Sequence, residues 1–308
     1  MDTYQYIIDA YTGASFVVQF AIIALFVLVC TILFLIVTLK VIRSSLRIKD
    51  NEILKFKKEY EALLVEYLYS GDDTNELTAV QHTIILKLKE GIEVNSIRKS
   101  VITILSGLMN EVSGEMSESI KALYRKSGLI DYAILRLNSK KWHINAKAIG
   151  ELRRFKIYET EAQILGFINH PRVEVRKEAQ VYLVHLFKFK GLSFLDDFKL
   201  PLSEWHQLQL LESLLNFDEQ VIGDIKPWLK SPNASVVLFA LKLAKIYNQF
   251  DAKPVLIELL SHPEKAIRIS TIDVLSLLFG YEIDDLIKAN CADLNTDEQL
   301  YILEHLEE

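Results

Sequence analysis

Histidines and paired aspartates are the side chains of this sequence whose chemistry could serve a reaction or hold a metal ion. Of the seven histidines, His170 and His262 stand in equivalent places, each directly before a proline. No cysteine or acid recurs beside them at the spacing of a metal site, so we interpret both as polar groups of turns. The sequence therefore predicts no metal ligand.

Three pairs of adjacent aspartates could supply a general acid and base or hold a cation. They are Asp72–Asp73, Asp196–Asp197 and Asp284–Asp285. Adjacent acids at helix starts more often interact with the helix dipole. The chain has no glycine-rich phosphate loop, no GxSxG elbow and no HExxH motif. Cys291 has no identified basic partner, which favours a packed or idle thiol. We therefore expect no catalytic residue, no cofactor and no small-molecule substrate, and a protein that is not an enzyme.

The elements that must position these side chains repeat along the second half of the chain. Four segments agree column by column when aligned at Leu137, Ile168, Leu229 and Leu260. A proline follows in three copies, as Pro171, Pro232 and Pro263, and Lys140 takes its place in the fourth. At steps of four residues after it come a β-branched column, a small column and an apolar column. They are Ile144, Val175, Val236 and Ile267; Ala148, Ala179, Ala240 and Thr271; and Leu152, Leu183, Ala244 and Leu275. Steps of four place these columns on one helical face, with the small column where a neighbouring backbone approaches closely.

Each copy is expected to be a pair of helices. Proline costs no hydrogen bond in the first turn of a helix, so we expect it there. A preceding helix is predicted at 218–229 and at 251–260. Around Pro201 the proline remains but the columns shift, which indicates a repeat with a rotated face. The segment 295–308 has apolar residues on one side and acids on the other, as expected of a terminal cap.

The residues of these columns carry a resemblance to a known family. The pattern P-x-x-x-(V/I)-R-x-x-(A/S) occurs from Pro171 through Val175 and Arg176 to Ala179, and again from Pro263 to Thr271. It resembles the HEAT-repeat family, especially its short bacterial form, over residues 137–308. The period of about 31 is shorter than the ~40–47 residues usual for HEAT units. Asn145 and Val237 replace the arginine in two copies. The resemblance implies a right-handed α-solenoid of helix pairs.

Composition agrees with an all-α fold. The 308 residues are 50% hydrophobic and include only 11 glycines and 6 prolines, too few chain breakers for an all-β protein. The two cysteines, Cys30 and Cys291, make no disulfide framework and suit a reducing compartment.

An apolar segment at the front predicts one transmembrane helix ahead of the repeats. Residues 16–39 contain no charge, and as a helix they would extend about 36 Å against a hydrocarbon core of about 30 Å. A cleaved signal peptide is the alternative, but it needs a basic front and a shorter apolar core. Here the front carries Asp2 and Asp9 and no basic residue. We place the span at 16–42.

Basic residues follow the span and set its predicted orientation. Between residues 40 and 58 there are seven basic residues and two acids. The positive-inside rule places this side in the cytoplasm, so we expect a single-pass protein of the inner membrane with residues 1–15 outside. Anionic lipid headgroups are possible ligands of this cluster. The nearest candidates are Lys40, Arg43, Arg47 and Lys49.

Between the span and the repeats we expect a basic juxtamembrane helix at 43–70 and an irregular helical region at 71–136. A heptad stripe runs through Leu46, Ile53, Phe56, Tyr60, Leu63 and Tyr67. It suits either a coiled-coil dimer or packing on the repeats, and its aromatic residues favour packing. Residues 97–105 also resemble 175–183, although the interval is not a multiple of the repeat.

These observations favour a binding protein. A solenoid presents an extended surface without a catalytic pocket, so we predict a membrane-anchored scaffold for a membrane or membrane-associated protein partner. Arg172, Arg176 and Arg268 are the candidate partner-binding residues. The alternative is an enzyme similar to the HEAT-like chromophore lyases, which hold a tetrapyrrole. Nucleic acid is disfavoured, because residues 41–308 carry 34 basic and 39 acidic side chains.

Overall fold

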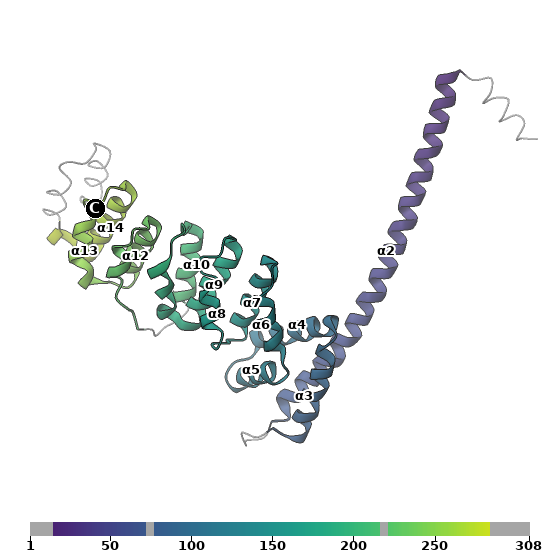
Figure 1. The fold of residues 1–308 in the computed structure, drawn as a ribbon, viewed down its shortest axis with the longest axis horizontal. Helices are drawn as coiled ribbons and strands as arrows, with labels where there is room; N and C mark the ends of the chain where they lie inside the picture. Colours follow the sequence, from purple (N-terminus) through teal and green to yellow (C-terminus); the bar gives the residue numbers. More distant parts are fainter. Residues whose placement is uncertain (1–14, 72–76, 216–220, 284–308) are drawn as a thin grey trace, which may run out of the picture. The chain divides into compact units, whose positions relative to one another are not determined.

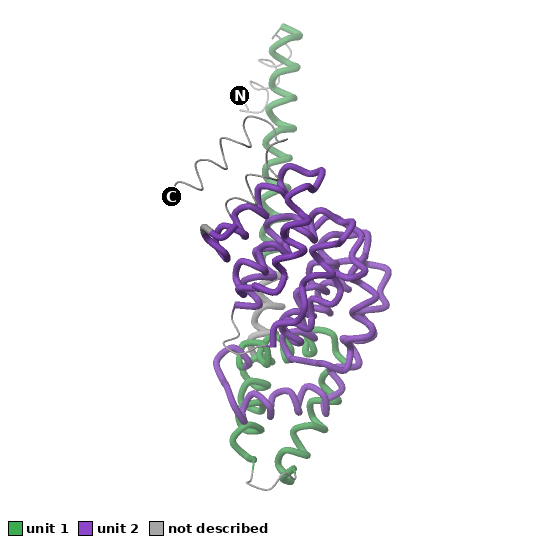
Figure 2. The backbone as a smooth tube through the Cα atoms, turned by 90° about the vertical axis from the view of Figure 1, so that its left-hand side faces the viewer, with its two compact units in different colours: residues 1–108 green, residues 109–308 purple. Residues whose placement is uncertain are grey.

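The computed structural model describes residues 15–71, 77–215 and 221–283, and these form helices and turns without a β-strand. The side chains of residues 45–55 and of Tyr281 are not among those described. The expectation of an all-α fold is confirmed. Two compact units divide the chain, Met1–Leu108 and Met109–Glu308 (Figure 2). Their boundary falls inside the region that we expected at 71–136. The predicted cap at 295–308 lies outside the described residues.

In the first unit, one long helix joins the apolar segment to the folded part. Helix α2 runs from Phe16 to Tyr69 without a break (Figure 1). Its sequence contains no glycine or proline, the residues that most often kink or end a helix. The segment Phe16–Ser44 is long and apolar enough to cross a membrane, and none of it is buried against the rest of the chain.

The far end of α2 packs against helix α3 (Ala79–Ile92). Tyr60, Leu64 and Tyr67 are buried there, whereas Phe56 is 39% exposed. The contact is close, because a Cβ atom on Gly91 of α3 would lie 2.2 Å from the Tyr60 hydroxyl. The predicted stripe is therefore used for packing in part. Its buried residues follow the helical spacing of four and three, which takes Leu64 in place of Leu63.

Helix α4 (Asn95–Glu111) follows α3 after a tight turn. Val101 and Leu105 are buried, in the places that Ala179 and Leu183 occupy in the resembling segment. Arg98 donates from Nη1 to the carbonyl oxygen of Ile92 at 2.8 Å. Arg176 makes the same six-residue contact, to the carbonyl of His170. The likeness between 97–105 and 175–183 therefore extends to the contact that closes the turn.

The second unit is a succession of short helices (Figure 1). In chain order they are α5 (Glu115–Lys126), α6 (Leu129–Leu137), α7 (Trp142–Arg154), α8 (Glu161–Leu165), α9 (Val173–Phe187), η1 (Lys188–Asp197), α10 (Glu204–Leu215), α11 (Lys226–Leu229), α12 (Ala234–Ile246), η2 (Phe250–Ala252), α13 (Lys253–Leu259), α14 (Lys265–Phe279) and η3 (Gly280–Ile283). The η segments are 3₁₀-helices. Helix α7 packs on α9, α9 on α10, and α12 on α14.

The repeat columns form the core of this unit. Every residue of the small column, from Ala148 to Thr271, has no exposed surface, and the apolar column from Leu152 to Leu275 is at most 2% exposed. The β-branched column is buried at Val175, Val236 and Ile267, but Ile144 is half-buried. The predicted inward face is therefore confirmed in α9, α12 and α14, and nearly so in α7.

The place of the repeat prolines differs from the prediction. Pro171, Pro232 and Pro263 each lie one residue before the N-cap, so they belong to the turn and not to the first helical turn. Proline does begin the partner helices, at Pro227 of α11 and Pro254 of α13. These helices are shorter than the predicted 218–229 and 251–260 in their described residues, because proline lacks the N–H group that an interior position must donate.

The shifted repeat around Pro201 has a 3₁₀-helix in place of its first α-helix. Segment η1 lies so close to α9 that a Cβ atom on Gly191 would be 2.2 Å from the carbonyl oxygen of Leu183. Helix α10 then supplies the second member. Its buried His206 and Gln207 contact α9 and α12 respectively, at Gln180 and Ser235.

Candidate functional site

The turns that precede α7, α9, α12 and α14 share one polar contact. In each, a side chain accepts a hydrogen bond from the backbone N–H two residues further on. The acceptors are Ser139 (3.2 Å), His170 (3.1 Å), Ser231 (3.2 Å) and His262 (3.0 Å). The two histidines accept through Nδ1, so the expectation that they are turn residues is confirmed. The sequence showed the histidine pair, but not that serine performs the same task in the other two copies.

The same turns explain two of the three arginines predicted to bind a partner. Nη1 of Arg176 donates to the carbonyl oxygens of His170 and Pro171, at 2.7 and 3.1 Å. Nη1 of Arg268 donates to those of His262 and Pro263, at 2.7 and 2.9 Å. Both residues are half-buried. Their guanidinium groups close the turns of their own repeats. Binding of a partner by these two residues stays a prediction.

Two copies lack the arginine, and in one of them a different side chain binds a carbonyl group of the turn. Asn145 takes the place of arginine and donates from Nδ2 to the carbonyl oxygen of Leu137 at 2.8 Å. Val237 takes it in the third copy and is buried. The arginine column is thus interrupted by another turn-binding side chain in one copy and by a buried apolar side chain in the other.

Arg172 differs from the other two arginines because its side chain is exposed. Its guanidinium carbon lies 5.9 Å from the ring centre of Trp142, a cation–π distance. Trp142 is 38% exposed and meets His143 edge to face at 5.7 Å. The first turn of α7 and the N-cap of α9 are thereby held side by side.

We call this surface the Trp142 patch, and it consists of Lys140, Lys141, Trp142, His143 and Arg172. Lys140, Lys141 and His143 are exposed, as is Arg172. Neither of the two lysines forms an ion pair with the part of the chain that the structure describes, and Arg172 forms none there either. The first turn of α7 contains no acid, and that of α9 contains Glu174. Cations thus surround an exposed tryptophan in a chain whose net charge is −6.

Of this patch, sequence reasoning selected Arg172 alone. Trp142 occupies a column that holds Val173, Ala234 and Lys265 in the other copies. A large aromatic residue at the start of one helix, after two lysines, departs from those copies. This difference from the other copies is the sequence signal that could have identified Trp142.

The predicted lipid-binding residues all lie on α2. Lys40 and Arg43 are exposed near the end of the apolar segment. Arg47 and Lys49 lie on the same helix, but their side chains are outside the described set. One helix therefore carries all four within about 15 Å of Lys40, given a rise of 1.5 Å per residue.

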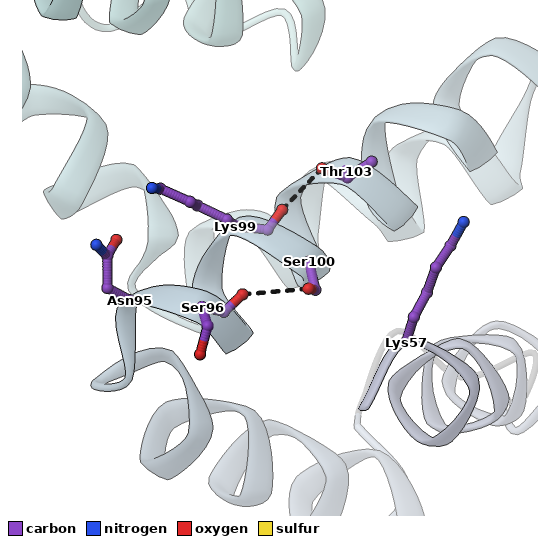
Figure 3. Close-up of a pocket in the computed structure, with 6 residues that line it drawn as sticks. All are labelled: Lys57, Asn95, Ser96, Lys99, Ser100 and Thr103. Atoms are coloured by element: carbon purple, nitrogen blue, oxygen red, sulfur yellow. Dashed lines mark hydrogen bonds between the residues drawn. The ribbon is translucent and has the colours of Figure 1, made fainter. Parts of the chain in front are cut away.

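A shallow hollow of about 420 Å³ lies in the first unit beside α2 and α4. Ser96, Ser100 and Thr103 form a row on α4, and Lys57 and Lys99 extend on either side of it (Figure 3). The Ser100 and Thr103 hydroxyls donate to carbonyl oxygens within α4, at 3.1 and 2.8 Å. The two ammonium groups attract anions but do not converge on one point, so the hollow offers charge without a fixed binding geometry.

Two buried polar clusters are part of the core. Glu151, which is 8% exposed, accepts from the Tyr124 hydroxyl at 2.7 Å and from Arg136 Nη2 at 2.5 Å. Burial and the adjacent carboxylate raise the pKa of Tyr124 well above 10. His206 lies 2.5 Å from the Gln180 amide oxygen, and burial lowers its pKa to about 4. Glu151 and His206 have hydrogen-bond partners and are buried away from solvent, which favours structural roles for both.

No group of three or more histidine, cysteine, aspartate or glutamate side chains suitable for a metal ion occurs in the described ranges. The aspartate pair at 196–197 shows what one such acid does. Asp196 accepts a hydrogen bond from the Trp228 indole at 2.6 Å. The pairs at 72–73 and 284–285 lie outside the described residues.

Comparison with known protein families gives no match, and comparison with curated proteins gives none either. Among solved structures, the crystal structure of an engineered protein matches 72% of this chain and 95% of its own, at 14% identity and a TM-score of 0.25. That score is too low to support an argument about fold.

Proposed function

We propose that the protein is a single-pass, membrane-anchored scaffold whose HEAT-like helix pairs form a right-handed α-solenoid and bind a protein partner at the cytoplasmic face of the inner membrane. The observation that carries this proposal is the continuity of α2. The same helix that is apolar over Phe16–Ser44 buries Tyr60 and Tyr67 in the first folded unit. An anchor built into the fold confines every surface of that unit to the membrane.

Two further observations support the choice of a binding protein. The polar clusters that most resemble active-site groups are satisfied parts of the core, at Glu151 and His206. Exposed aromatic residues occur instead at helix starts, at Trp142 and Trp205, which are 38% and 67% exposed. Tryptophan is enriched among the residues that dominate protein interfaces.

The orientation rests on the basic residues that follow the span. Protease added outside intact cells should leave residues 44–308 uncut, and opening the cells should expose them. Digestion of this region in intact cells would reverse the proposed topology.

The scaffold role is tested by crosslinking in native membranes, followed by recovery of the protein and its partner. Removal of residues 16–39 should lower recovery of the partner, because tethering raises the effective concentration without adding a contact. An unrelated transmembrane helix of the same length and direction should restore it. Equal recovery with and without the anchor would contradict the proposal.

A further inference from the structure

We propose that the Trp142 patch is the docking surface for an acidic segment of a partner protein, one that also carries apolar side chains. This inference rests on the proposed scaffold function and assigns the partner class and the contact surface.

The first argument is charge complementarity. Lys140, Lys141 and Arg172 are exposed and have no ion-pair partner among the described residues. Two other cations of the same unit form ion pairs, Arg125 with Glu159 at 2.9 Å and Lys230 with Glu258 at 2.9 Å. Complementary potentials steer association and select the partner. An acidic segment supplies the carboxylates that this surface lacks.

The second argument is the residue type at the centre. Tryptophan and arginine are among the side chains most enriched in interface hot spots, and here the Arg172 guanidinium lies over the Trp142 ring, 5.9 Å from its centre. Val173, 44% exposed, continues the apolar surface beside Arg172. An apolar side chain of the partner would cover the open part of the Trp142 ring and exclude water from the charged contacts.

The third argument is preorganisation. The backbone N–H groups of Lys141 and Arg172 are bound by Ser139 and His170, which fixes both turns. Nη1 of Arg176 also donates to the carbonyl oxygen of His170 in the second turn. A surface fixed in advance loses less conformational entropy when it binds.

Nucleic acid has the same sign of charge but fits less well. The patch has three permanent cations, and the whole chain carries 41 acids against 35 basic residues. A phosphate backbone presents charge at every nucleotide and would meet this acidic surplus beyond the patch. A short acidic segment could bind the patch without extending to these acidic residues.

The test uses the full chain in micelles of a neutral detergent and two short synthetic peptides with the same leucine and phenylalanine residues. One carries glutamate at its charged positions and the other carries lysine. Single-stranded DNA and vesicles containing phosphatidylglycerol are the competing probes. We expect the glutamate peptide to bind in a salt-sensitive way and to quench or shift the tryptophan fluorescence, and the lysine peptide not to bind.

Two variants locate the binding. Trp142→Ala, and separately Lys140→Glu with Lys141→Glu, should each weaken binding of the glutamate peptide by about tenfold or more. The lysine changes are on exposed side chains, so the melting temperature should stay the same. Lys265→Glu is the control for the change of charge, because Lys265 is an exposed lysine of the last repeat and stands in the column of Trp142. It should leave binding unchanged.

The proposal is overturned if the glutamate peptide does not bind, if the patch variants bind it as well as the parent protein does, or if DNA or vesicles occupy the same residues more tightly. The scaffold role fails separately. If deletion of the anchor lowers partner recovery but the patch variants do not, the scaffold stands and this surface is wrong. If no partner is recovered although the peptide binds at Trp142, the surface stands and the scaffold is wrong.

Discussion

At the scale of single residues, arginine has two different tasks in the repeats, and exposure separates them. Arg176 and Arg268 are half-buried and bind the carbonyl groups of their own turns. Arg172 is exposed and lies over an aromatic ring. Equal charge at neighbouring places in a repeat therefore does not imply equal function. Only the first two arginines should matter for folding.

Replacement of Arg176 by glutamine tests this division. The shorter neutral side chain loses the contacts to the carbonyl groups of His170 and Pro171, which share one donor atom, Nη1. A hydrogen bond from a charged group contributes roughly 1.5–3 kcal/mol. We expect the free energy of unfolding to fall by about 1–3 kcal/mol in chemical denaturation. Arg172→Gln is the control and should change it by less than about 0.5 kcal/mol. Equal effects of the two changes would contradict the structural assignment.

His206 predicts a dependence of stability on pH. Burial lowers its folded pKa to about 4, while the ordinary value is 6.5. The unfolded chain therefore binds more protons between these values, so the stability from the neutral imidazole is complete above about pH 6.5 and is lost as the pH falls toward 4. At pH 5 the loss should be about 2 kcal/mol.

The measurement compares denaturation midpoints at pH 7.5 and pH 5 for the parent protein and for His206→Gln. The variant will be less stable at both values, but its midpoint should change less between them. His185 shifts in the same direction through burial and nearby Arg153, so His185→Gln shows how much of the dependence belongs to the second histidine. An unchanged pH dependence in His206→Gln would place the titration elsewhere.

At the scale of elements, the close contact between α2 and α3 depends on a residue without a side chain. Substitution of Gly91 by alanine would place a Cβ atom 2.2 Å from the Tyr60 hydroxyl and 3.0 Å from its ring carbon. Overpacking of this kind costs about 1–3 kcal/mol. We expect a lower melting temperature for Gly91→Ala.

Gly107 is the matched control, because a Cβ atom on it would meet nothing within 4 Å. Alanine is the better helix former, so Gly107→Ala should keep or raise the melting temperature. Tyr60→Phe combined with Gly91→Ala removes the nearest atom and should recover part of the loss. If the two glycine changes behaved alike, the packing of α2 on α3 would be wrong.

The sequence predicts those features of the elements that depend on a regular period. Steps of four residues placed Ala179, Ala240 and Thr271 at the core, and all are buried. Features set by single local contacts were not accessible in this way. A proline fits the turn before a helix as well as the first helical turn, so Pro171 was misplaced by two residues. The Trp142 patch joins two turns 31 residues apart, and the contact of Arg172 with Trp142 requires the packing of α7 on α9.

At the scale of the whole molecule, the apolar segment of the first unit continues into the folded part of that unit without a linker. Helix α2 contains 54 residues, which corresponds to about 80 Å. Between Ser44, where the apolar segment ends, and the buried Tyr60 the helix rises about 24 Å. A continuous helix transmits rotation as well as distance, and a flexible linker transmits neither.

Insertion after Ser44 of helix-forming residues tests this rigidity. Five residues would turn the folded part of the first unit by about 140° relative to the apolar segment, whereas seven would return it to within about 20° of its native direction. We expect crosslinked partner recovery to fall further with five residues than with seven, although seven raise the unit more. A glycine and serine insertion of either length should abolish the difference. Equal recovery with five and seven helical residues would indicate a bend in α2 between the apolar segment and the folded part of the first unit.

A continuous helix therefore transmits rotation about its axis from one end to the other. If the proposed span turned about its axis, through a change in its packing against another membrane protein, Tyr60 and the α3 helix packed against it would turn through the same angle. No glycine or proline lies between the apolar segment and Tyr60 to absorb the motion. In the proposed membrane-anchored protein, the apolar segment would do more than attach the chain, because its rotation would set the direction in which the folded part of the first unit faces.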